Sequence, residues 1–358
     1  MRNHRSHRNR TNKILIIWCI VATFLLIALG IFEATRVIGK STLFAKNAVS
    51  APVTKSTEVL TKTESAMKWE DDWVKHNGEI YDYNDDIMTF LIMGIDKSDE
   101  EVSPVYGEIN GGQADALFLI VFNPHNKTTK VIGINRNTMT DIELYDEYGN
   151  YVNTIKAQIT LQHGFGDGME KSCELQKRAV SDLFYKLPIH GYAAINMSAI
   201  TAINDAVGGV DVTPTSDFES GDYYFKAGET VHLDGEAAYA FLRSRDMTQF
   251  GSADDRLGRQ KVYMTAFIKQ VIERAESQPT LAVDIYNTIS KQMVTDVSVN
   301  QLSYIATTVS GYDFGPDSLY LLEGKTVLGE EFEEFYPDED AKYEMFLDIF
   351  YEKLDVKG

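Results

Sequence analysis

The sequence predicts an α/β domain, with a mixed sheet flanked by helices, behind an N-terminal transmembrane helix. Three observations predict this architecture. Residues 14–32 carry no charge, short β-rich apolar runs fall between residues 87 and 134, and segments with helical periodicity follow from residue 172 onward. Strands mixed with helices in this way are typical of layered α/β or α+β domains.

The composition is that of a globular protein with an acidic surface. Of the 358 residues, 44% are hydrophobic and 24% are charged, and the formal net charge is -19. These values exclude a disordered chain and a disulfide-stapled miniprotein. We expect no nucleic-acid partner, because so acidic a chain repels a polyphosphate.

The uncharged stretch at residues 14–32 is predicted to be a transmembrane helix. Its 19 residues, at about 1.5 Å each, come close to the roughly 30 Å of bilayer hydrocarbon. Residues 1–13 hold five Lys or Arg and no acid, which predicts a cytoplasmic basic tail and an extracytoplasmic main domain. A cleaved signal peptide is the alternative, but its apolar core is usually only about 7–15 residues long. We therefore expect a single-pass protein of the cell membrane.

The exported part divides into three predicted regions. Residues 33–84 begin with a segment rich in Ala, Thr, Lys and Glu that has little apolar periodicity, and they are predicted to form an extracytoplasmic stalk. Residues 85–275 are predicted to form the α/β domain. Residues 276–358 are expected to be a C-terminal helical extension packed on the core, in which the acidic segment 330–340 is a solvated surface.

Three strands are expected at residues 87–93, 116–122 and 130–134. Their near-continuous apolarity favours central strands that are covered on both faces. The second and third are joined by residues 123–127, a turn-rich link short enough for a hairpin.

Helical patterns follow the predicted strands. They are expected at 172–185, 197–207, 235–242 and 255–275, and an amphipathic segment lies around 343–354. Asp234 directly precedes the third of these helices and is a plausible N-cap, since a side-chain oxygen there accepts from the free N–H groups of the first turn.

Basic residues cluster where one predicted helix ends and the next begins. Arg243 and Arg245 close the first helix, while Arg256 and Arg259 open the second, with Gln260 on the same face as Arg256. Arginine presents a planar fork of donors that suits phosphate oxygens, and a helix N-terminus adds backbone donors. The pattern predicts an anion of more than one charge. The alternative is a set of surface salt bridges with nearby aspartates, each worth about 0–1 kcal/mol.

Charged residues also lie at the ends of the predicted strands. Asp96 follows the first strand, Asp115 precedes the second and Arg136 follows the third. If these strands are neighbours, the three side chains gather near the rim of the sheet, where open α/β sheets bind ligands. Two carboxylates among arginines suit Mg²⁺, or Mn²⁺, shared with phosphate oxygens. The alternative for each aspartate is a cap or turn position.

These segments resemble the LytR-CpsA-Psr family of cell-wall glycopolymer ligases. The resemblance runs from about residue 87 to 275, and the basic N-terminus with a single span is similar to that family's layout. Its most specific pieces are residues 237–245, AAYAFLRSR, and 255–260, DRLGRQ. Residues 91–96, LIMGID, 134–138, INRNT, and 205–212, DAVGGVDV, support it.

The resemblance implies a membrane-anchored, Mg²⁺-dependent phosphotransferase that moves a polyprenyl-pyrophosphate-linked glycopolymer, such as teichoic acid or capsule, onto peptidoglycan. It implies that Asp96, Asp115 and Arg136 are catalytic and that Asp96 and Asp115 are placed with the metal or the attacking hydroxyl. The residues implied to bind the pyrophosphate are Arg136, Lys156, Arg243, Arg245, Arg256, Arg259 and Gln260. The polyprenyl tail would occupy an apolar tunnel in the core.

The chain departs from the family pattern near two of these residues. Gln113 and Ala116 stand where the family usually has Arg and Thr or Ser, and Asn135 and Asn137 stand where it prefers Pro and Asp. Each lost charge-assisted contact is worth about 1.5–3 kcal/mol, which predicts weaker anion or metal binding. Two other functions stay open: a non-catalytic regulator that binds polyprenyl phosphates or wall polymer, and a hydrolase of lipid pyrophosphates.

Overall fold

The computed structural model describes residues 33–44, 51–54, 56, 58, 70–97, 101–102, 111–146, 148–244, 250–278 and 280–354. Within these ranges, none of the helices combines the length and apolarity that crossing a membrane requires. The predicted transmembrane helix at 14–32 and the basic tail at 1–13 lie outside the described residues.

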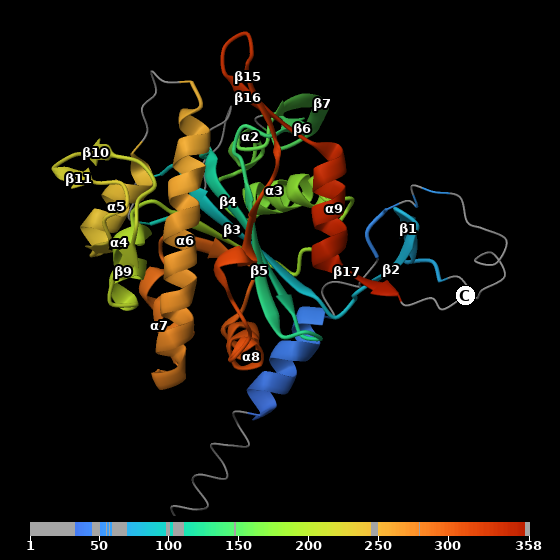
Figure 1. The fold of residues 1–358 in the computed structure, drawn as a ribbon, viewed down its shortest axis with the longest axis horizontal. Helices are drawn as coiled ribbons and strands as arrows, with labels where there is room; N and C mark the ends of the chain where they lie inside the picture. The colour runs from blue at the N-terminus through green and yellow to red at the C-terminus, as the bar shows by residue number, and fades with distance from the viewer. Residues whose placement is uncertain are drawn as a thin grey trace, which may run out of the picture.

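The centre of the protein is a mixed sheet, of which Figure 1 labels β3, β4 and β5. Its described strands run in the order β13-β8-β3-β4-β5-β14. Strand β4 is antiparallel to both β3 and β5, whereas β3 pairs with β8, and β5 with β14, in parallel. The ends of β3 and β5 therefore flank the start of β4. The strands are β3 (Met88–Ile95), β4 (Ala114–Asn123), β5 (Thr128–Ile134), β8 (Gly191–Asn196), β13 (Met293–Thr295) and β14 (Leu319–Leu321).

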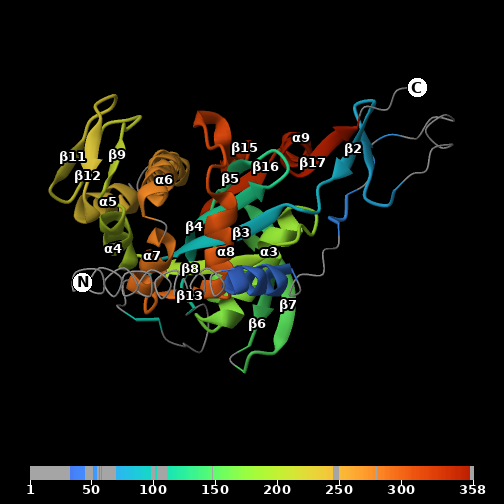
Figure 2. The ribbon, with the colours of Figure 1, turned by 90° about the horizontal axis from the view of Figure 1, so that it is seen from below.

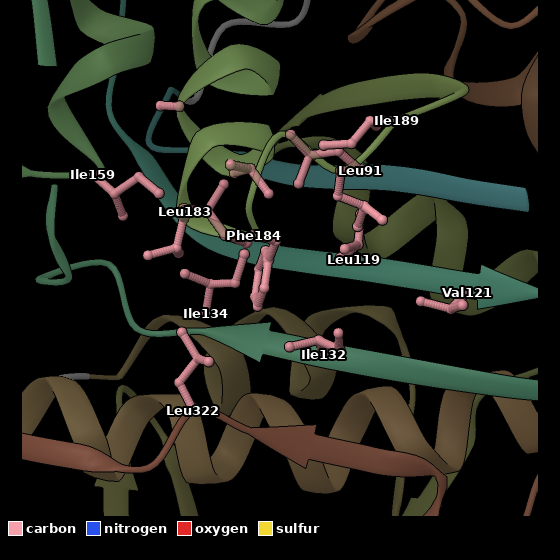
Figure 3. Close-up of a cluster of buried hydrophobic side chains, with 14 of the residues drawn as sticks. Leu91, Leu119, Val121, Ile132, Ile134, Ile159, Leu183, Phe184, Ile189 and Leu322 are labelled. Carbon is pink, nitrogen blue, oxygen red and sulfur yellow. The ribbon is translucent and has the colours of Figure 1, made fainter. Parts of the chain in front are cut away.

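The three predicted strands are confirmed as β3, β4 and β5, and the predicted hairpin joins β4 to β5. One face of these strands is filled by a hydrophobic core (Figure 3). Leu91, Leu119 and Ile132 are fully buried there against Phe184, which follows α3 (Glu170–Leu183). Helix α9 (Glu339–Phe350) closes the same core with Phe346.

Helices cover the opposite face of the sheet, with α6 running alongside it (Figure 1). They are α4 (Ala199–Ala206), α5 (Gly235–Arg243), α6 (Ser252–Ser277), α7 (Leu281–Ile289) and α8 (Val299–Val309). The predicted N-cap of α5 is confirmed, because the Asp234 side chain accepts from the Ala237 N–H at 2.9 Å. Helices α4 to α7 share a second apolar cluster with β9 (Val210–Val212) and β12 (Val231–Leu233).

Several short hairpins have no counterpart in the sequence prediction. They pair β6 (Met139–Tyr145) with β7 (Tyr151–Gln158), β10 (Phe218–Ser220) with β11 (Tyr223–Phe225), and β15 (Gly324–Leu328) with β16 (Glu333–Pro337). The last two pairs are only three to five residues long, which is too short for period-two alternation to stand out from chance.

The two ends of the described chain contact the domain. Residues 33–44 form a helix beside α8 (Figures 1 and 2), and Leu43 packs against Tyr304 and Ile305 of α8. Strands β1 (Val74–His76) and β2 (Glu79–Tyr83), within the predicted stalk, form a sheet with β17 (Tyr351–Leu354). The predicted C-terminal extension is not purely helical, because it also supplies β13 and β14 to the central sheet.

Candidate active site

A cavity of about 1160 Å³ lies between the second face of the sheet and the covering helices. Its walls are largely apolar, and residues of β3, β4, α6, α7 and α8 contribute to them. Representative wall residues are Phe90, Ile120, Phe122, Phe267, Ile268, Ile285 and Ile305. A largely apolar cavity is therefore present in the part of the protein where the resemblance implies an apolar tunnel.

Charged side chains line the cavity where β4 begins and β3 and β5 end. Arg136 Nη1 lies 2.9 Å from Asp115 Oδ1, and Arg256 Nη1 lies 3.0 Å from Asp115 Oδ2. The three side chains are only 14%, 12% and 10% exposed for Arg136, Asp115 and Arg256. The predicted gathering of strand-end residues is confirmed for Asp115 and Arg136, and α6 adds Arg256 from far along the chain.

Asp96 and Gln113 extend this charged end. The Asp96 N–H donates to the Gln113 carbonyl at 3.0 Å, and the Gln113 side-chain oxygen accepts from Arg136 Nη2. Asp96 lines the cavity and is exposed. Within the described ranges Asp96 makes no ion pair, whereas both oxygens of Asp115 are engaged by arginines.

Arg243 and Gln260 complete the predicted residues that line the cavity. Arg243 lies in the last turn of α5, is exposed, and donates to the Tyr239 hydroxyl at 2.9 Å. Gln260 is 8% exposed and follows Arg256 by about one turn of α6, as the shared helix face predicted. Arg245 lies outside the described residues.

Two of the predicted binding residues do not line the cavity. Lys156 lies on β7, and its ammonium pairs with Asp141 at 3.4 Å on the surface. Arg259 is buried and donates to the carbonyl of Ser244, the C-cap residue of α5. Its guanidinium carbon lies 4.6 Å from the centre of the Phe218 ring. Burial lowers the pKa of Arg259. Arg259 and Gln260 are adjacent in α6 and therefore project from different sides of the helix. The Arg259 side chain thus links α6 to the end of α5 and does not line the cavity.

Three further polar residues line the charged end without having been predicted: Asn137, Gln158 and Glu333. Gln158 Nε2 donates to the Glu333 carbonyl at 2.6 Å and to Asn137 Oδ1 at 3.3 Å. Glu333 belongs to the segment expected to be solvated surface. Glu333 lies at the cavity because β15 pairs with β16, and the local sequence does not predict this hairpin.

The donors at this end fit a hard divalent cation in type. Asp96 directly follows β3, and Asp115 lies at the start of the neighbouring strand β4, so each supplies carboxylate oxygens at this end of the sheet. Mg²⁺ commonly combines one or two carboxylates with phosphate oxygens. Across the described ranges, no group of three or more His, Cys, Asp or Glu side chains is placed to hold a metal. Such a cation would therefore depend on ligand oxygens as well as on the two aspartates.

The cavity as a whole suits an amphiphilic anion. Arg136, Arg243 and Arg256 offer donors at one end, and the apolar walls follow β4 and α6 away from them. A multiply charged head at the arginines with an apolar chain along the walls satisfies both ends.

Comparison with known proteins shows which family the sequence matches. The LytR_cpsA_psr family matches residues 48–315. A Bacillus cereus relative named "Polyisoprenyl-teichoic acid--peptidoglycan teichoic acid transferase TagU" is 30% identical over 216 residues, which cover 60% of this chain and 62% of the relative. The match thus spans less than two thirds of that relative's length.

Solved structures share the fold. The crystal structure of B. subtilis TagV superposes with a TM-score of 0.55 at 23% identity, over 74% of this chain and 95% of TagV. The structure described as "TagT bound to LI-WTA" gives a TM-score of 0.54 at 19% identity, over 74% and 89% of the two chains. Because the family match extends over well more than half of the sequence, the chain belongs to the LytR_cpsA_psr family.

Proposed function

We propose that this protein is a membrane-anchored, extracytoplasmic phosphotransferase that moves a polyprenyl-pyrophosphate-linked glycopolymer, of teichoic acid or capsule type, onto peptidoglycan. The observation that carries the proposal is the apolar cavity of about 1160 Å³ that ends at Arg136, Asp115 and Arg256. The name of the B. cereus relative supports a transferase with this class of substrate.

The Asp115 carboxylate lies between Arg136 and Arg256, in the position where we propose that a phosphate group binds. Both of its oxygens pair with guanidinium groups, at 2.9 and 3.0 Å. A pyrophosphate carries more charge and more oxygens than one carboxylate, so it competes for Arg136 and Arg256. Binding then releases Asp115 toward the reaction centre. This exchange couples substrate binding to the availability of the carboxylate.

The proposed reaction needs positioning and charge neutralisation more than covalent catalysis. An acceptor hydroxyl oxygen forms a bond to the sugar-linked phosphorus, and the bridging P–O bond of the pyrophosphate breaks. Polyprenyl phosphate leaves, and the hydroxyl proton passes to a carboxylate. Asp96 suits this role because it lines the cavity, is exposed and has no arginine partner within the described residues.

Asp96 and Asp115 are also the residues proposed to hold Mg²⁺, which would neutralise charge on the leaving phosphate. Residues 14–32 are proposed to span the membrane and keep the cavity near a lipid-borne donor. The helical residues 33–44, which follow that segment in the sequence, pack on α8, whose Ile305 lines the cavity. This contact supports a fixed position of the domain near the bilayer.

The test uses the full chain in detergent micelles with a farnesyl-pyrophosphate-linked disaccharide, a peptidoglycan fragment and Mg²⁺. We expect transfer of the disaccharide phosphate to the fragment, measured by mass spectrometry. A chelator should abolish transfer, and Arg136→Ala and Arg243→Ala should each abolish or strongly reduce it. Lys156→Ala is the matched control, since this cation lies outside the cavity.

The same assay separates the alternatives. Release of farnesyl phosphate without any acceptor would identify a lipid pyrophosphate hydrolase. Binding of the donor with no product in the wild-type protein, at any metal concentration, would identify a carrier-binding regulator. Because Arg136→Ala leaves Asp115 with one of its two partners, circular dichroism should confirm that this variant is folded.

A further inference from the structure

The β15–β16 hairpin borders the charged end of the cavity, although it lies beyond residue 315, where the family match ends. Phe332 and Glu333 of this hairpin line the cavity. Figure 1 shows the hairpin near the start of α6. This part of the site is therefore built by residues that the family match does not include.

The Glu333 carboxylate connects two segments that carry arginines. Its Oε1 accepts from the Gly251 N–H at 2.7 Å, at the N-cap of α6, the helix that carries Arg256. Its Oε2 accepts from Asn137 Nδ2 at 3.4 Å, next to Arg136. A carboxylate at a helix N-terminus is also favoured by the helix dipole.

The hairpin itself is fixed to the same two segments. The Phe335 N–H donates to the Asn137 carbonyl at 2.9 Å, and the Thr326 hydroxyl donates to Asp254 Oδ2 at 2.6 Å in the first turn of α6. Gln158 holds the Glu333 carbonyl from a third element, β7. The Glu333 side chain therefore projects from a fixed backbone toward a defined place.

We infer that Glu333 is a positioning residue, which ties the start of α6 to the loop after β5 so that Arg256 and Arg136 face the same phosphate group. The inference rests on the proposed function. Positioning depends on the reach of the side chain and on its acceptor oxygen. The negative charge is favourable at the N-terminus of α6, but it repels the anion that the arginines bind, so we expect it to add little to ligand binding.

Two conservative variants separate reach from charge. Glu333→Gln keeps the reach and one acceptor oxygen, which serves the 2.7 Å bond to Gly251. It loses the charge, and it places an amide donor where the carboxylate accepts the longer, 3.4 Å bond from Asn137. Glu333→Asp keeps the charge and is shorter by one methylene, so it cannot hold both partners. The matched control is Glu334→Gln, because Glu334 points to the other side of β16 and accepts from the Tyr336 hydroxyl at 2.6 Å.

The experiment measures dissociation constants of the full-length variants for farnesyl pyrophosphate and for farnesol, which has the tail without the charge. We expect Glu333→Ala and Glu333→Asp to weaken farnesyl pyrophosphate binding about tenfold, the effect of one charge-assisted hydrogen bond. Glu333→Gln should stay within about threefold of wild type, a loss smaller than that of one such bond. Farnesol binding should be unchanged in every variant, and Glu334→Gln should match wild type for both ligands.

Three results would overturn the inference. Wild-type binding by Glu333→Asp with weak binding by Glu333→Gln would show that charge matters and position does not. Equal losses for farnesol and farnesyl pyrophosphate would show general damage to the fold. Unchanged binding by Glu333→Ala would refute only the positioning role of Glu333. A wild-type protein that does not bind farnesyl pyrophosphate would refute the proposed function as well.

Discussion

Strand β4 sends alternate side chains to opposite faces of the central sheet, and the two sets have different neighbours. Leu119 and Val121 are at most 1% exposed and belong to the core that α3 and α9 close. Ile120 and Phe122 line the cavity instead. The two faces are equally apolar in sequence, so apolarity alone does not distinguish a filled layer from one that leaves room for a ligand.

The difference between the faces comes from how the covering helices are stabilised. On the filled face, α3 and α9 bury their apolar sides directly against the sheet. On the cavity face, α4 to α7 share an apolar cluster with β9 and β12, which includes Val210 and Leu233. Because these helices have a core of their own, they do not need to close onto every part of the sheet. A space the size of a ligand is therefore compatible with a stable fold.

The largest expected effect separates Leu119→Ala from Ile120→Ala. Leu119 is fully buried, so its truncation opens a void in the filled layer and should cost about 2–5 kcal/mol of the free energy of unfolding. Ile120 already borders the cavity, so its truncation adds no new closed void. We expect its cost to be about half as large or less.

Urea denaturation of the two variants measures this difference. The slope of the free energy of unfolding against urea concentration should remain at the wild-type value, so that midpoints can be compared directly. Equal losses for both variants would mean that the cavity face is packed as tightly as the other.

A second effect concerns His163, which lies on the filled side beside Cys173. Burial lowers its pKa from 6.5 to about 4. As the pH falls, His163 is therefore protonated near pH 6.5 in the unfolded chain but only near pH 4 in the folded chain. Stability should be complete above pH 6.5 and fall as the pH drops toward 4, by about 3 kcal/mol for this group.

The measurement is the free energy of unfolding in urea at intervals from pH 7 to pH 4. His163→Gln should flatten the dependence on pH in this window. Part of the dependence should persist, since burial also lowers the pKa of His190 to about 4. Parallel curves for the wild type and His163→Gln would contradict the assignment.

Much of the fold could be predicted because its main elements carry long, regular signals. Strands β3, β4 and β5 are seven to ten residues long, and α5 begins at the capping residue that the sequence indicates. The three-residue strands β13 and β14 could not be predicted in this way. Their place in the sheet depends on pairing with β8 and β5, which is a long-range contact.

The site residues likewise divide into those that the sequence could predict and those that depend on long-range contacts. Asp115 and Arg136 could be brought together in advance because their strands are joined by a short hairpin. Arg259 could not be separated from its neighbour Gln260, because local spacing does not say which side of α6 faces the cavity. Glu333 could not be predicted as a site residue for a third reason, because the β15–β16 hairpin, far along the chain, brings it to the start of α6.

The smallest expected effect compares two exposed cations, Arg243 at the cavity and Lys156 away from it. Arg243→Ala should weaken binding of farnesyl pyrophosphate about tenfold, because it removes one charge-assisted contact to the anion. Lys156→Ala removes only a surface ion pair with Asp141, so neither affinity nor stability should change by more than about 0.5 kcal/mol. Titration calorimetry of both variants at one salt concentration makes the comparison, since long-range attraction between exposed charges is screened by salt. If the two losses were equal, exposed cations in general would attract the ligand, and the position of Arg243 at the cavity would not explain pyrophosphate binding.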